Sequence, residues 1–245
     1  MVIHGGIDGF SRLVVMLHCS SNNGSKTVMD LFSTAIQCYR TPLRLRTDHG
    51  TENVRIARYM LEKHGVQSKP VITGKSVHNQ RIERLWVDVF IYVTQQFRNI
   101  FYFLETEDDM NPDDDLHIFA LHFVFMPRVN RSLVEFWDGW NHHPVRTEKN
   151  RSPLAIWTEG FYNHTGADTD ILDMTESDIN LYGVDFDGPT PELQTNNNIK
   201  VPEIDINLSP ICEQYIQDNF DPLENDGNFG IDIYRRLVQY LETNV

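Results

Sequence analysis

The first hundred residues alternate between short strand-like runs and helical patterns, and this alternation limits the fold more than any other feature of the chain. The helical segments are indicated by apolar residues that recur at intervals of three and four. Strands are expected at residues 2–4, 12–18, 43–46 and within 66–73, and helices at 26–39, 53–64 and 80–104. The order strand, strand, helix, strand, helix, strand, helix predicts an α/β architecture in which helices cover a mixed sheet.

The rest of the chain changes character twice. An acidic connector, residues 105–115, leads into a further helical pattern over 116–140 with a possible break at Pro127. A short helix is expected after Ser152, with serine as its N-cap. Beyond Gly160 the periodicity weakens. The sequence therefore predicts a domain over residues 1–160 and an acidic, partly disordered C-terminal extension over 161–245.

The charge distribution supports this division. Residues 1–100 hold 13 Lys and Arg against 7 Asp and Glu, whereas residues 161–245 hold 3 against 17. A basic first part is compatible with a polyanionic partner. The 3 cysteines contain no Cys-x-x-Cys pair, which disfavours a zinc finger and a disulfide framework. The most apolar stretch, residues 116–126, is too short to span a bilayer. An intracellular protein without a membrane segment is expected.

Two carboxylates, Asp48 and Glu83, are candidates for a functional site. Asp48 follows a predicted strand, and Glu83 lies near the start of a predicted long helix. Side chains at a strand end and a helix start can converge on a hard divalent cation, which prefers oxygen ligands. Taken alone, Asp48 is better explained as a turn aspartate and Glu83 as an exposed helical glutamate.

The surrounding motifs make the interpretation specific. Taken in order, Ile7–Arg12, Arg46–Asn53 and His78–Trp86 resemble the integrase core domain of retroviruses, retrotransposons and related DNA transposons, and are most similar to its eukaryotic, transposon-derived group. Phe136–Pro144 and Ser152–Pro153 are similar to the segment that closes such domains. The resemblance covers about residues 1–160.

The resemblance implies a ribonuclease H-like fold and a DDE motif, in which three carboxylates bind Mg²⁺ or Mn²⁺ for phosphoryl transfer on DNA. By motif position, Asp48 and Glu83 correspond to the second and third carboxylates. The first belongs to a strand that would precede residues 2–7, so we expect an incomplete site and weak activity. Asp8 belongs to a turn motif and is expected to bond local amides instead.

The resemblance also implies double-stranded DNA as partner, a nuclear location in a eukaryote and a homo-oligomer. Lys75, Asn79, Arg81 and Arg84 surround the start of the long helix and are the expected DNA-binding residues, since basic clusters neutralise phosphates without reading sequence. Two alternatives stay open: a domesticated DNA-binding module without catalysis, and a protein-interaction scaffold dominated by the acidic end.

Overall fold

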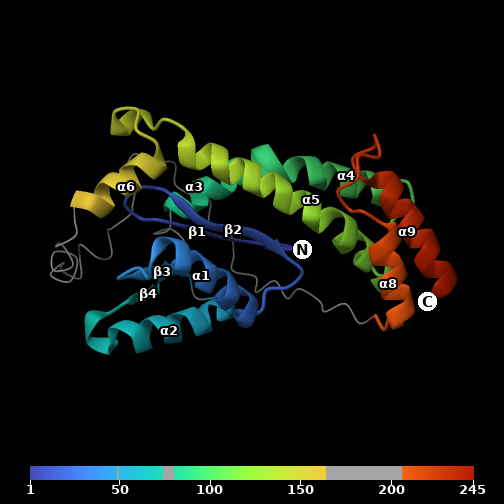
Figure 1. Ribbon diagram of the computed structural model, residues 1–245, viewed down its shortest axis with the longest axis horizontal. Helices are drawn as coiled ribbons and strands as arrows, with labels where there is room; N and C mark the ends of the chain where they lie inside the picture. Colours follow the sequence, from blue (N-terminus) through green and yellow to red (C-terminus); the bar gives the residue numbers. More distant parts are fainter. Residues whose placement is uncertain (49, 74–79, 164–205) are drawn as a thin grey trace.

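The computed structural model describes residues 1–48, 50–73, 80–163 and 206–245. It is a mixed α/β structure, as the sequence predicts (Figure 1). Strands β1 (Val2–Ile7) and β2 (Val14–Ser20) form an antiparallel pair, and β3 (Leu45–Thr47) and β4 (Val71–Thr73) form a parallel pair. One mixed sheet was expected, whereas within the described residues the two pairs are separate two-stranded sheets.

The helices up to residue 163 follow the predicted order, whereas the helix over 210–219 was not predicted. The described helices are α1 (Ser25–Tyr39), α2 (Val54–His64), α3 (Gln80–Val89), α4 (Gln95–Thr106), α5 (Asp115–His142), α6 (Pro153–Asn163), α8 (Pro210–Asn219) and α9 (Ile231–Asn244). Short 3₁₀ turns precede α2 (η1, Thr51–Asn53), β4 (η2, Val66–Ser68) and α6 (η5, Arg146–Glu148). Among the described helices, none is long and apolar enough to cross a membrane.

The expected long helix over 80–104 is one rod with a π-helical segment, η4 (Phe90–Thr94), between α3 and α4. Its buried residues Leu85, Val89, Val93 and Phe97 recur every four positions. Four residues of α-helix advance by about 40° more than a full turn, so a strict four-residue repeat drifts around the helix. The wider π turn corrects this drift and keeps the apolar stripe on the inner side.

Helix α5 continues through Pro127, so the break expected there does not occur. Proline removes one backbone hydrogen bond, which costs on the order of 3 kcal/mol in a helix interior. The flanking residues are anchored on both sides of the proline, because Val124, Phe125 and Val129 are all buried. Tertiary packing therefore outweighs the local preference.

Helix α5 also closes the outer edge of β2 with side-chain hydrogen bonds. The Asn130 amide accepts from Cys19 N–H at 2.8 Å and donates to Cys19 C=O at 3.0 Å. The Asn141 amide makes the same pair of bonds with Val14, at 2.9 and 3.0 Å, and Trp137 Nε1 donates to Val14 C=O at 2.7 Å. The two asparagines thus replace a neighbouring strand, which removes one exposed sheet edge.

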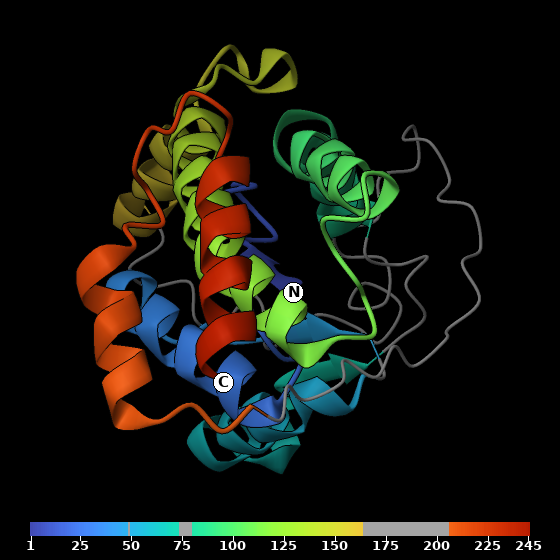
Figure 2. The ribbon, with the colours of Figure 1, turned by 90° about the vertical axis from the view of Figure 1, so that its right-hand side faces the viewer.

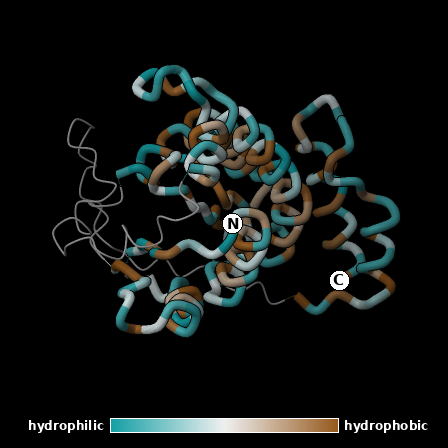
Figure 3. The backbone as a smooth tube through the Cα atoms, turned by 60° about the vertical axis from the view of Figure 1, so that its left-hand side comes forward, coloured by the Kyte–Doolittle hydropathy of each residue, from teal (hydrophilic) through white to brown (hydrophobic). Residues whose placement is uncertain are grey.

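Two hydrophobic cores organise the chain. The smaller core joins α1 and α2 through Val28, Phe32, Ile56 and Met60, with Leu45 of β3 packed against it. The larger core combines residues of β2 and the helices α3, α4, α5, α8 and α9. Figure 2 shows α9 lying alongside α5, and in Figure 3 apolar segments gather among these central helices. The described part of the predicted acidic extension, residues 206–245, therefore belongs to the main core.

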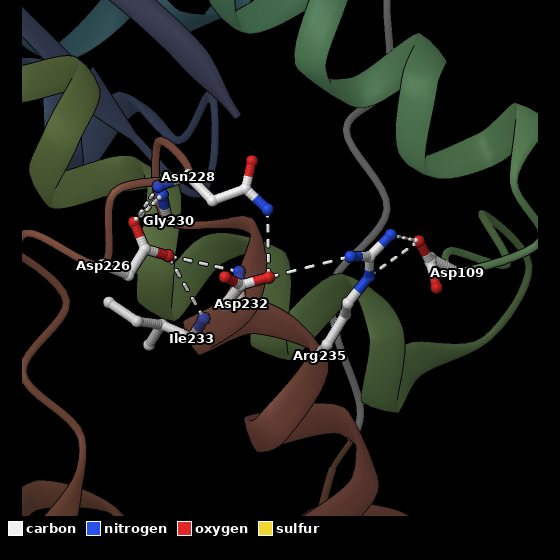
Figure 4. Close-up of polar contacts among 7 residues, drawn as sticks. All are labelled: Asp109, Asp226, Asn228, Gly230, Asp232, Ile233 and Arg235. Carbon is white, nitrogen blue, oxygen red and sulfur yellow. Dashed lines mark hydrogen bonds and ion pairs between the residues drawn. The ribbon is translucent and has the colours of Figure 1, made fainter.

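The loop before α9 is ordered by one carboxylate (Figure 4). Asp226 accepts hydrogen bonds from the backbone N–H groups of Asn228, Gly230, Asp232 and Ile233. Slight burial acts to raise the pKa of Asp226, but these four N–H groups outweigh it and hold the pKa below its usual value. Asp226 thereby satisfies the N-terminal amides that α9 leaves unbonded.

Helix α9 is further tied to the α4–α5 connection. The Tyr234 ring is fully buried, and its hydroxyl lies 3.2 Å from His117 Nδ1 and donates to the Asp109 carbonyl at 3.3 Å. Arg235 Nε donates to the Asp109 carboxylate at 2.9 Å. The polar end of a core tyrosine thus has partners from two other segments, as buried hydroxyls require.

Candidate functional site

Asp48 is exposed and lies directly after β3, as the sequence predicts. The Asp48 Oδ1 atom accepts the Gly50 N–H at 3.3 Å and the Asn53 side-chain amide at 3.0 Å. Strand β3 is positioned by its parallel pairing with β4 and by Leu45, which packs on the smaller core. The strand therefore places the Asp48 carboxylate at a defined point on the surface.

Glu83 lies in the first turn of α3 and is half-buried. Burial raises the pKa of the Glu83 carboxyl, and the negative charge of Asp48 raises it further. The two carboxylates are thus close enough for the charge of one to act on the other. The convergence of Asp48 and Glu83 on one cation stays a prediction.

Helix α3 is seated by a contact between Trp86 and β1. A Cβ atom added to Gly5 would lie 2.6 Å from the Trp86 ring, so the indole rests directly on the glycine backbone. Glycine is required where a ring approaches a strand this closely. Since Glu83 is one turn before Trp86 on the same helix, this contact also helps to position Glu83 relative to β1.

The donor set suits a hard divalent cation. Two carboxylates, one exposed and one half-buried with its charge disfavoured, offer oxygen ligands to Mg²⁺ or Mn²⁺, and a cation between them would offset their mutual repulsion. Across residues 1–48, 50–73, 80–163 and 206–245, no group of three or more His, Cys, Asp and Glu side chains is arranged to hold a metal ion.

Asp8 has the local role that the sequence predicts. The Asp8 Oδ2 atom accepts the Phe10 N–H at 3.1 Å, the Ser11 N–H at 2.7 Å and the Ser11 hydroxyl at 2.7 Å. These bonds close the turn between β1 and β2. All three donors reach the same carboxylate oxygen, which is typical of an aspartate that orders a turn.

The expected DNA-binding residues are partly visible. Arg81 is half-buried, and Arg84 is exposed and forms an ion pair with Asp88 at 3.3 Å. Lys75 and Asn79 lie outside the described residues. The site also includes Asn53, which sequence reasoning did not single out although it ends the same motif as Asp48.

The comparisons with known proteins agree with this geometry. A family model described as "Integrase core domain" matches residues 1–170, which is more than half of the chain. The comparisons with curated proteins and with solved structures gave no match. Taken with the α/β architecture and the order of the motifs, the match shows that the chain belongs to the integrase core domain family and has its ribonuclease H-like fold.

Proposed function

We propose that this chain is a transposable-element-derived domain for integrase-type phosphoryl transfer on double-stranded DNA. In this proposal, Asp48 and Glu83 are the protein ligands of Mg²⁺ or Mn²⁺. The observation that carries it is the position of Asp48 directly after β3 and of Glu83 in the first turn of α3, in a chain of the integrase core domain family. The charge of Asp48, which acts to raise the pKa of Glu83, is consistent with it. When bound, such a cation stabilises negative charge on the phosphoryl oxygens and activates the attacking hydroxyl.

The proposal includes weak activity for residues 1–245 alone, because the family uses three carboxylates and this site combines two. We place the remaining one, the first carboxylate of the family, on a strand between β1 and β3, the point where the expected mixed sheet divides into two pairs. Cys19 directs both its N–H and its C=O toward α5, so its antiparallel partner Ile3 directs both groups away from β2. Within the described residues no hydrogen bond reaches them. The β1 edge is therefore suited to a further strand.

Metal-dependent nicking of plasmid DNA tests the catalytic part of the proposal. We expect slow nicking in Mn²⁺ that EDTA abolishes and that Asp48→Asn removes. Asp30→Asn, an exposed carboxylate on α1, is the matched control and should leave nicking unchanged. Nicking that survives Asp48→Asn would contradict the assignment. DNA binding without any Mn²⁺-dependent nicking would instead support the non-catalytic DNA-binding module.

The basic residues around the start of α3 are proposed to contact DNA phosphates. The double substitution Lys75→Ala and Arg81→Ala is expected to weaken DNA binding and to reduce the slope of log K against log salt by about 1.8, since each phosphate contact contributes about 0.9. Fluorescence anisotropy at several salt concentrations measures this slope. The double substitution Lys63→Ala and Arg236→Ala removes the same charge from α2 and α9 and should preserve the slope. An unchanged slope in the first variant would remove Lys75 and Arg81 from the interface.

Asn79 and Arg84 complete the proposed DNA contact. Assembly into a homo-oligomer on DNA is a further part of the proposal, since it is implied by the resemblance to integrases. A nuclear location is another, since the proposed substrate is chromosomal DNA. The division of the chain near residue 160 also stays a proposal. The described residues 206–245 nevertheless share the main core with residues 85–133.

A further inference from the structure

The side chain of Asn53 forms a hydrogen bond that is unusual for its position in the chain. It occupies the N-cap position of α2, where an asparagine side chain ordinarily accepts a bond from a backbone N–H of the first turn. No such capping bond is formed by Asn53. Its side-chain amide donates instead to Asp48 Oδ1 at 3.0 Å, five residues back along the chain. The side chain therefore donates its hydrogen bond to Asp48 and does not cap its own helix.

The direction of this bond follows from chemistry alone. A carboxylate only accepts hydrogen bonds, so the Asn53 atom facing Asp48 must be the amide nitrogen. The Gly50 N–H reaches the same oxygen at 3.3 Å. Within the part of the chain that the structure describes, both hydrogen bonds to the Asp48 carboxylate reach Oδ1. The two donors therefore restrain the Asp48 side chain through this oxygen.

The donor is held by a rigid support. The Asn53 N–H bonds to the Gly50 carbonyl at 3.2 Å, which closes the turn between Asp48 and α2. Helix α2 is anchored one and two turns later by Ile56, which is 3% exposed, and Met60, which is fully buried. Ligands are placed more precisely when their supporting hydrogen bonds come from packed elements.

We propose that Asn53 is a positioning residue, whose amide orients the Asp48 carboxylate for a divalent cation. This inference rests on the proposed function of Asp48 as a cation ligand. Hydrogen bonds to metal-binding carboxylates typically contribute 10–100-fold to metal affinity. Asn53 thus extends the site from two residues to three without adding a ligand.

The test is Mn²⁺ affinity of the full chain by isothermal titration calorimetry. Asn53→Leu, which keeps the branched shape and removes the donor, is expected to weaken Mn²⁺ binding about tenfold or more. Asn244→Leu is the matched control, because the exposed Asn244 also donates its side-chain amide, to the Tyr240 carbonyl at 2.7 Å, but on α9. The control should bind Mn²⁺ like the unsubstituted chain.

Two further readouts separate orientation from a general structural role. Asn53→Gln keeps an amide donor on a longer side chain and should bind Mn²⁺ more tightly than Asn53→Leu, while DNA binding in EDTA stays the same in both. In the unsubstituted, ¹⁵N-labelled chain, the Asn53 side-chain amide resonance should move on addition of Mg²⁺. That measurement requires no variant to fold.

The outcomes are distinguishable. Unchanged Mn²⁺ affinity in Asn53→Leu, equal affinity of the leucine and glutamine variants, or an unmoved amide resonance at saturating Mg²⁺ would overturn the role of Asn53. Mn²⁺ binding by the unsubstituted chain that Asp48→Asn does not weaken would instead overturn the proposed function, and the role of Asn53 with it.

Discussion

Replacing Tyr234 with alanine is expected to lower the free energy of unfolding of the full chain by about 3–5 kcal/mol, the usual cost of removing a large aromatic side chain from a core. The ring is fully buried and meets the Phe125 ring of α5 at a centroid distance of 6.1 Å. Truncation would leave a cavity between α5 and α9 and deprive His117 Nδ1 of a partner. Urea unfolding followed by circular dichroism measures the change.

Two further substitutions serve as controls for the Tyr234→Ala prediction. Tyr234→Phe keeps the ring and removes one hydroxyl, so it should cost about 0.5–1.5 kcal/mol. Tyr162→Ala removes a side chain of a residue that is 72% exposed and should cost much less. A loss below about 1 kcal/mol for Tyr234→Ala would show that residues 206–245 do not share a cooperative core with the integrase domain.

Glu83→Gln is expected to remove about half or more of the stabilisation that Mn²⁺ gives to the unsubstituted chain. At a free Mn²⁺ concentration of about one hundred times Kd, binding to the folded state alone adds about 2.7 kcal/mol. Loss of one of two carboxylate ligands weakens Mn²⁺ binding, and a tenfold weaker affinity reduces this gain to about 1.4 kcal/mol. Thermal unfolding with and without Mn²⁺ measures the difference, and the exposed Glu62→Gln on α2 is the matched control.

The same variant has a distinctive pH dependence without metal. Burial and the charge of Asp48 raise the pKa of Glu83 in the folded state. The folded chain therefore binds this proton more tightly than the unfolded chain, and the resulting stability is present at low pH and lost as pH rises through the raised pKa. In EDTA at neutral pH, Glu83→Gln should unfold at a higher temperature than the unsubstituted chain. A lower unfolding temperature would contradict the unfavourable environment of the Glu83 charge.

The sequence predicts most of the local elements because their signals are local. The apolar period located α1 and the rod of α3 and α4. Gly65, whose φ is +78°, ends α2, and glycine is common directly after the end of a helix because it tolerates positive φ. Pro127 misled the prediction because the local cost of proline is outweighed by burial of its neighbours in α5. Residues 206–245 were expected to belong to an acidic extension, and their place in the main core depends on contacts that a local pattern does not contain.

The candidate site shows the same division. The turn role of Asp8 follows from motif and position and is confirmed by its hydrogen bonds. Asp48 and Glu83 follow from the same kind of reasoning, and their joint role as cation ligands stays a prediction. Asn53 was missed because the sequence pattern assigns it only to the start of the helix over 53–64, and only the three-dimensional path of the turn reveals its bond to Asp48. The closure of the β2 edge by Asn130 and Asn141 was missed for a similar reason, since its partners lie more than 100 residues apart in sequence.

The central claim is that Asp48 and Glu83 form one cation site, and calorimetric titration of Mn²⁺ into the full chain tests it most directly. The account predicts one saturable binding event that Asp48→Asn and Glu83→Gln each weaken by at least tenfold, with a loss in the double variant that exceeds either single loss but is smaller than their sum in free energy, because the two residues hold the same ion. Mn²⁺ binding that neither substitution changes, or two binding events that each respond to only one substitution, would contradict a shared site.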